Sequence, residues 1–142
     1  MQKDDRLIYL MARAQHRLRA FMKKKFSDQG LNITPVQTGI LFLLQKDALT
    51  MTELSQVLSI DNSAVTGLVD RLEKAGLAER QMNANDRRAF LVRITDQGTK
   101  EINRAHKIVK HVNEKIKDGF TDKEVETFKK VLDSFFEKFR KE

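Results

Sequence analysis

The chain has 142 residues, in which 27 lysines and arginines outnumber 20 aspartates and glutamates, so its formal net charge is +7 at pH 7. This basic balance favours a polyanionic partner such as nucleic acid without identifying it. The chain contains no cysteine, which excludes disulfides, thiolate metal sites and thiol redox switches. One compact domain fits this length, but a monomer of this size buries only about 70% of its unfolded surface. Some apolar faces are therefore expected to need a partner.

No targeting signal or membrane span is expected. Charged residues between Lys3 and Arg6 precede the first apolar residues, unlike the apolar core of a signal peptide. The longest apolar run, Ile40–Leu44, is far shorter than the roughly 20 residues that a transmembrane helix needs. We therefore expect a cytoplasmic protein with no membrane partner.

An amphipathic helix is predicted at the start of the chain. Apolar residues recur at alternating steps of four and three from Leu7 to Phe21, which predicts a helix from about Asp4 to Phe26. Gly30 then ends the pattern.

A second, enclosed helix is predicted to begin at Thr34. Thr34 is a suitable N-cap, Pro35 suits the first helical position, and Gln37 completes a capping box. Because Ile40–Leu44 is apolar all round, this helix is expected to lie at the centre of the fold.

Two short helices are predicted next, as a helix-turn-helix over about residues 52–74. Thr50 and Glu53 form another capping box, followed by an expected buried face of Leu54, Val57 and Leu58. A short connection, residues 59–61, leads to a helix with apolar residues at i, i+3, i+4 and i+7. That helix ends at Gly76, which suits a left-handed cap.

The opposite face of that last helix carries short or polar side chains instead of the Lys and Glu that are usual in solvent. Short polar groups let a helix approach base edges closely, so this face favours contact with a DNA groove over plain exposure. This face carries Asn62, Ser63, Thr66, Gly67 and Asp70, and the first four are the candidate contact residues.

A β-hairpin follows over about residues 78–95. Leu77–Gln81 and Ala89–Ile94 are the predicted strands, and the seven residues between them are predicted to form a projecting polar loop. Arg80 lies on the first strand, where contact with a phosphate and ordinary exposure are equally consistent with the pattern. The loop ends in Asp86, Arg87 and Arg88, and arginines at a hairpin tip suit a narrow minor groove.

Two further helices are predicted after the hairpin. Thr95 or Asp96 can cap the first, which Gly119 stops, and a capping box at Thr121 starts the second. Five of the nine phenylalanines lie at or after Phe120, too many for one terminal helix to bury, so a partner surface is favoured over packing within the chain.

The sequences VTGLVDRLEKAGLAER, Val65–Arg80, and NDRRAFLVRIT, Asn85–Thr95, resemble the MarR family of winged-helix transcription regulators. The flanking helices resemble that family too, so the resemblance covers nearly the whole chain. It implies a mainly α fold with a small β-hairpin wing, about six helices and two to three short strands. Residues 1–142 would be one domain, with 31–95 as the winged helix-turn-helix lobe and 1–30 and 96–142 as a helical dimerisation region.

The resemblance also implies a function. Members are homodimers that bind a pseudo-palindromic operator in double-stranded DNA, so we expect a sequence-specific transcription regulator, in the simplest case a repressor. A small aromatic or phenolic anion commonly releases such proteins by binding between the dimer helices and the winged lobe. Tyr9, Arg13 and His16 could line that crevice, although packing or plain exposure is the alternative for each.

The resemblance gives roles to the wing residues. The family places its groove-reading arginine directly after the aspartate, which here is Arg87 after Asp86. A free carboxylate would repel DNA, so Asp86 is expected to pair with Arg71. Arg71 lies on the second helix of the helix-turn-helix, the recognition helix, and this pair would lock the wing to that helix. A solvated, unpaired Asp86 is the alternative.

Enzymatic activity is not supported by the sequence. His16, His106 and His111 do not match a zinc-ligand spacing, and no nucleophile motif or glycine-rich phosphate loop is present. We therefore expect no catalytic residues, no metal and no cofactor. The remaining alternative is a winged helix used for protein contact or for sequence-independent DNA packaging.

Overall fold

The protein is described by a computed structural model of residues 6–140, excluding the side chains of residues 86–88. Within these residues the chain forms six helices and one antiparallel sheet of three strands. The helices are α1 (Leu7–Asp28), α2 (Pro35–Lys46), α3 (Met51–Leu58), α4 (Asn62–Lys74), α5 (Asp96–Lys117) and α6 (Asp122–Lys138). The strands are β1 (Leu49–Thr50), β2 (Ala78–Asn83) and β3 (Asp86–Ile94), with β3 in the centre.

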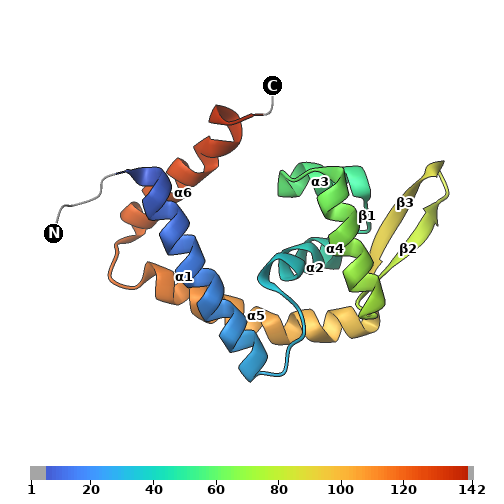
Figure 1. The fold of residues 1–142 in the computed structure, drawn as a ribbon, viewed down its shortest axis with the longest axis horizontal. Helices are drawn as coiled ribbons and strands as arrows, with labels where there is room; N and C mark the ends of the chain where they lie inside the picture. Colours follow the sequence, from blue (N-terminus) through green and yellow to red (C-terminus); the bar gives the residue numbers. More distant parts are fainter. Residues whose placement is uncertain (1–5, 141–142) are drawn as a thin grey trace.

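The ribbon separates into a winged lobe and a helical part (Figure 1). The winged lobe contains α2, α3, α4 and the sheet, and the β2–β3 hairpin projects from it. Helix α5 begins at the foot of this hairpin and runs across to α1, and α6 follows after a turn at the far end of α5. The predicted fold class, mainly α with a small β-hairpin wing, is confirmed.

The helix starts follow the predicted caps. The side chains of Thr34, Thr50 and Thr121 each accept a hydrogen bond from the backbone N–H three residues later, and the side chain at that position accepts one from the backbone N–H of the threonine. Between the two candidates for α5, Thr95 is the N-cap. A side-chain cap of this kind typically stabilises a helix by about 1 kcal/mol, so these starts are determined locally.

The core of the winged lobe surrounds α2, as its apolar sequence predicts. Ile40 and Leu41 are fully buried, and Phe26 from the end of α1 joins the same core. The expectation for α3 is wrong in one respect, because Val57 is 56% exposed while Leu54 is fully buried. A helix of eight residues presents a narrow apolar stripe, and Val57 lies on its edge, turned away from the core.

The wing lies over the predicted residues, but its strands are longer than predicted and the expected seven-residue loop is wrong. Strand β2 continues to Asn83 and β3 begins at Asp86, which leaves a two-residue turn. Backbone hydrogen bonds continue the ladder through polar residues, and a register shift after Met82 adjusts the pairing. The Asn83 Oδ1 atom also accepts a hydrogen bond from the Asn85 N–H at 3.0 Å. Apolar alternation therefore underestimates the length of the strands in a hairpin whose tip is polar.

Helix α5 meets the foot of the wing at a very close contact. A Cβ atom added to Gly98 would lie 2.1 Å from the Leu77 carbonyl oxygen and 2.7 Å from the Ile94 Cγ1 atom. The Thr95 N–H also donates to the same Leu77 oxygen at 3.1 Å. Only glycine allows α5 to approach the wing this closely.

The carboxy-terminal helix does not contribute to this core. None of the residues of α6 is buried in the single chain, and Phe136 and Phe139 are 61% and 72% exposed. Among the described helices, none is long and apolar enough to cross a lipid bilayer.

Gly98→Ala should lower the free energy of unfolding by about 1–3 kcal/mol, because the added methyl group overpacks the contact with Leu77. Denaturant titration followed by circular dichroism would measure the change. Gly39→Ala is the matched control, since its added Cβ has no atom within 4 Å and alanine favours a helix by up to about 1 kcal/mol. Unchanged stability of Gly98→Ala would show that α5 does not pack against Leu77 this closely.

Candidate nucleic-acid interface

A three-residue turn joins α3 to α4. Ser59 ends α3 in the left-handed region, with φ 56° and ψ 39°, and among the described residues it is the only non-glycine with positive φ. The Ser55 hydroxyl donates to the Ile60 carbonyl oxygen at 2.5 Å, which closes the turn. Because a left-handed conformation costs an ordinary residue roughly 1–2 kcal/mol, the surrounding contacts must hold this turn in place.

Asp61 is the N-cap of α4, a role that the sequence analysis did not assign. Its carboxylate accepts the Ala64 N–H at 2.9 Å and the Ser63 hydroxyl at 3.0 Å. The residue three positions after Asp61 is Ala64, which cannot complete a capping box. The aspartate itself was therefore the only sequence signal for this helix start. Ser63 therefore directs its hydroxyl hydrogen into the chain while its oxygen can still accept a hydrogen bond.

The predicted recognition residues share the solvent face of α4. The opposite face buries Val65, Val69 and Leu72 in the core. The structure thus brings together four exposed residues and one half-buried glycine, namely Asn62, Ser63, Thr66, Arg71 and Gly67.

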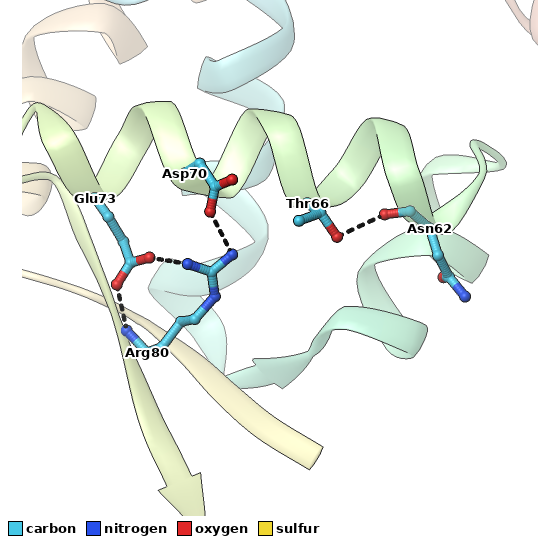
Figure 2. Close-up of polar contacts among 5 residues, drawn as sticks. All are labelled: Asn62, Thr66, Asp70, Glu73 and Arg80. Atoms are coloured by element: carbon cyan, nitrogen blue, oxygen red, sulfur yellow. Dashed lines mark hydrogen bonds and ion pairs between the residues drawn. The ribbon is translucent and has the colours of Figure 1, made fainter. Parts of the chain in front are cut away.

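Asn62 and Thr66 lie along one side of α4 (Figure 2). The Thr66 hydroxyl donates to the Asn62 carbonyl oxygen at 2.8 Å, and the Asn62 side chain extends away from the helix. Because no Cβ at Gly67 would meet an atom within 4 Å, the surface beside Thr66 is open. A narrow, polar and unobstructed helix face of this kind fits a DNA major groove.

Arg80 contacts carboxylates of the recognition helix. Its guanidinium group pairs with Glu73 and, at 2.6 Å, with the Asp70 Oδ1 atom. The Arg80 backbone N–H also donates to Glu73 at 3.2 Å. The sequence places Asp70 on the polar face of this helix, but it predicts neither the pairing of Asp70 with Arg80 nor a role for Glu73, because both contacts depend on how the wing folds against α4.

The described part of the wing has two distinct faces. Ala78 and Arg80 lie on the face directed at the lobe, whereas Arg93 is exposed on the other face, opposite Glu79 and bonded to Gln81. The backbones of Asp86, Arg87 and Arg88 belong to the first residues of β3. Their side chains lie outside the described structure, and with them the predicted pairing of Asp86 with Arg71.

The candidate effector residues lie on α1. Tyr9, Arg13 and His16 are exposed in the single chain and, at i, i+4 and i+7, share one side of the helix. The Arg6 guanidinium lies 4.7 Å from the centre of the Tyr9 ring. An aromatic ring and cationic groups are therefore close together on this helix.

Comparison with known proteins gives a consistent result. The family model that describes the MarR family matches residues 31–89. The multiple antibiotic resistance protein MarR of Escherichia coli is 35% identical over 104 residues, which cover 72% of this chain and 72% of that protein.

Solved structures give the same fold. A mutant E. coli MarR in complex with operator DNA has a TM-score of 0.80 and 29% identity, covering 90% of this chain and 91% of that one. The MepR–DNA complex of Staphylococcus aureus has a TM-score of 0.87 at 22% identity, covering 96% of this chain and 100% of that one. At that identity, MepR supports the fold alone.

The lobe and its exposed helix face define a winged-helix DNA-binding protein. The chain belongs to the MarR family, and it is a DNA-binding transcription regulator and not an enzyme. Proteins of this family act as dimers and bind small-molecule effectors.

Gly67→Ala should stabilise the free protein by up to about 1 kcal/mol, because alanine favours a helix and meets no atom there. The same methyl group should weaken operator binding about tenfold, if a base edge approaches Gly67 closely. Fluorescence anisotropy with labelled duplex would measure the affinity. Gly39→Ala, within α2, should leave it unchanged. Undiminished affinity of Gly67→Ala would contradict close approach of DNA at this position.

Proposed function

We propose that the protein is a repressor that binds a pseudo-palindromic operator as a homodimer. Each subunit inserts α4 into a major groove and its wing into the neighbouring minor groove. The observation that carries this proposal is the open polar face of α4, with Gly67 at its centre, beside a projecting hairpin. Two such lobes on one side of a duplex would contact it about 34 Å apart, one helical turn.

Ser63 and Thr66 are proposed to present oxygen atoms to the bases. Both hydroxyl hydrogens are directed into the chain, to Asp61 and to the Asn62 carbonyl. Their free lone pairs suit the amino groups of adenine and cytosine, which are the hydrogen-bond donors of the major groove. Asn62 contributes an amide that can both donate and accept, and Arg71 contributes positive charge.

The wing tip is proposed to supply the minor-groove contact. Asp86 begins β3 directly after the two-residue turn, so the backbones of Arg87 and Arg88 lie at the end of the hairpin. We assign groove insertion to Arg87, and Asp86 pairing with Arg71 would hold it in place. Arg88 is proposed to add positive charge beside it, because a narrow minor groove concentrates negative potential that attracts guanidinium groups.

Dimerisation is proposed to use residues 1–30 and 96–142, and DNA binding residues 31–95. The α5–α6 turn forms a hollow of about 730 Å³ whose apolar wall includes Ile116, Phe120, Val125 and Phe128. An apolar surface of this extent is unfavourable in water, and α6 has no buried residue of its own. A second subunit would remove both surfaces from solvent.

Regulation is proposed to come from a small aromatic anion near Tyr9, Arg13 and His16. The ring suits stacking and the arginine suits a carboxylate or phenolate. Such a ligand releases DNA only if it binds the DNA-incompetent arrangement of the lobes more tightly. We also propose a cytoplasmic location, because a transcription regulator must share a compartment with its DNA.

Selection of bound fragments from the genomic DNA of the source organism should yield inverted repeats with half-site centres about 10 base pairs apart. A selected site should bind at least about 10³-fold more tightly than a scrambled duplex at equal salt, and the protein should sediment as a dimer. Equal affinity for both duplexes would instead indicate a packaging protein, and a monomer at micromolar concentration would contradict the dimeric arrangement.

Arg87→Ala should weaken binding to the selected site by about 5–150-fold, the equivalent of 1–3 kcal/mol, without changing the sedimentation of the dimer. Arg93→Ala removes the same charge from an exposed position of β3 further from the wing turn, opposite Glu79, and is the matched control. Equal losses in the two variants would attribute the effect to general charge and would rule out groove insertion by Arg87.

A further inference from the structure

Two carboxylates stand beside the proposed DNA-reading face. Asp70 and Glu73 lie on the same side of α4 as Asn62 and Thr66 (Figure 2), and the Asp70 side chain is 50% exposed. Unpaired carboxylates in this position would repel the phosphates of a bound duplex. A cation of the protein itself is therefore needed to neutralise these two carboxylates, whether or not DNA is bound.

Arg80 supplies that cation from the neighbouring strand. The Nη1 atom contacts Glu73 and the Nη2 atom contacts Asp70, so one planar guanidinium bridges two carboxylates on successive turns of α4. The Arg80 side chain is only 26% exposed and that of Glu73 30%. A phosphate would have to compete with both carboxylates for these nitrogen atoms.

The contact lies where it can set the direction of the wing. Three residues separate the end of α4 from the start of β2, and Arg80 is opposite the fully buried Val92 in the hairpin. Beyond Arg80 the hairpin continues to its turn, and each residue of a strand adds about 3.4 Å to its length. A change of angle at Arg80 therefore displaces the tip relative to α4.

We propose that Arg80 is a positioning residue for DNA recognition. It joins the wing to the recognition helix through Asp70 and Glu73 and neutralises part of their charge, and it does not bind a phosphate. This role differs from both readings that the sequence left open for Arg80, a phosphate contact and ordinary exposure, and it rests on the proposed function.

A mutant cycle separates the two roles. The four proteins are the wild type, Arg80→Ala, the pair Asp70→Asn with Glu73→Gln, and the combination of all three. Arg80→Ala should weaken operator binding at least about tenfold when the carboxylates are present, because it leaves them unpaired. In the amide background, the same change should weaken binding less than threefold. Equal losses in both backgrounds would overturn the proposal.

The salt dependence gives a second, independent readout. A residue that binds a phosphate contributes about 0.9 to the slope of log K against log salt concentration. In the amide background, Arg80→Ala should leave that slope unchanged, and a fall of about 0.9 would assign Arg80 to a phosphate. Arg80→Lys retains the charge but cannot bridge two carboxylates in one plane. It should therefore resemble Arg80→Ala, whereas near-wild-type affinity would contradict the bridging role.

A DNA-free measurement distinguishes failure of this proposal from failure of the proposed function. Because the chain has no cysteine, spin labels can be placed selectively at Gln56→Cys on α3 and Ala84→Cys in the wing turn. Electron resonance should give a narrow label distance with Arg80 and a broader one with Arg80→Ala. Identical distributions would overturn the positioning role, even if the wild type bound no operator. Circular dichroism confirms that each variant is folded.

Discussion

Gly76 and Leu77 connect the recognition helix α4 to the wing, and the start of α5 contacts both of these residues. Gly76 turns the chain in the left-handed region, and the Leu77 N–H returns to the Leu72 carbonyl oxygen at 2.9 Å. The Thr95 hydroxyl donates to the Gly76 carbonyl oxygen at 2.6 Å, and Gly98 packs against Leu77. This junction therefore fixes α4, both wing strands and the start of α5 relative to one another.

The consequence for function is a rigid reading unit with a long helix attached. Because α4 and the wing share one junction, the spacing between the proposed major-groove contact and the proposed minor-groove contact is part of the fold. Helix α5 begins at the same point and runs to α1 (Figure 1). A change in the packing of the helical part would thus move α4 and the wing together. A ligand that favours one of two packing arrangements of the helices would in this way change the separation of the two lobes of a dimer.

The chain divides its apolar residues between two purposes. The winged lobe closes its own core, with Ile40, Leu54 and Val92 fully buried. Apolar residues also recur every three or four positions along helix α6, but none of its residues is buried. An amphipathic face without an intramolecular partner is the physical basis of association, because the free energy of burial is gained only when a second surface is present.

The sequence by itself determined the elements whose causes are local. A capping box spans four residues and an apolar helix face repeats within seven, so the helix starts at Thr34, Thr50 and Thr121 are recognisable without a fold. The lengths of the two wing strands were underestimated, since a strand ladder continues through polar residues when its partner strand is present. Only the tertiary structure decided that Arg80 meets carboxylates of α4 and that Gly98 must lack a side chain. Both depend on the angle between a helix and a hairpin, and no short-range pattern in a sequence encodes that angle.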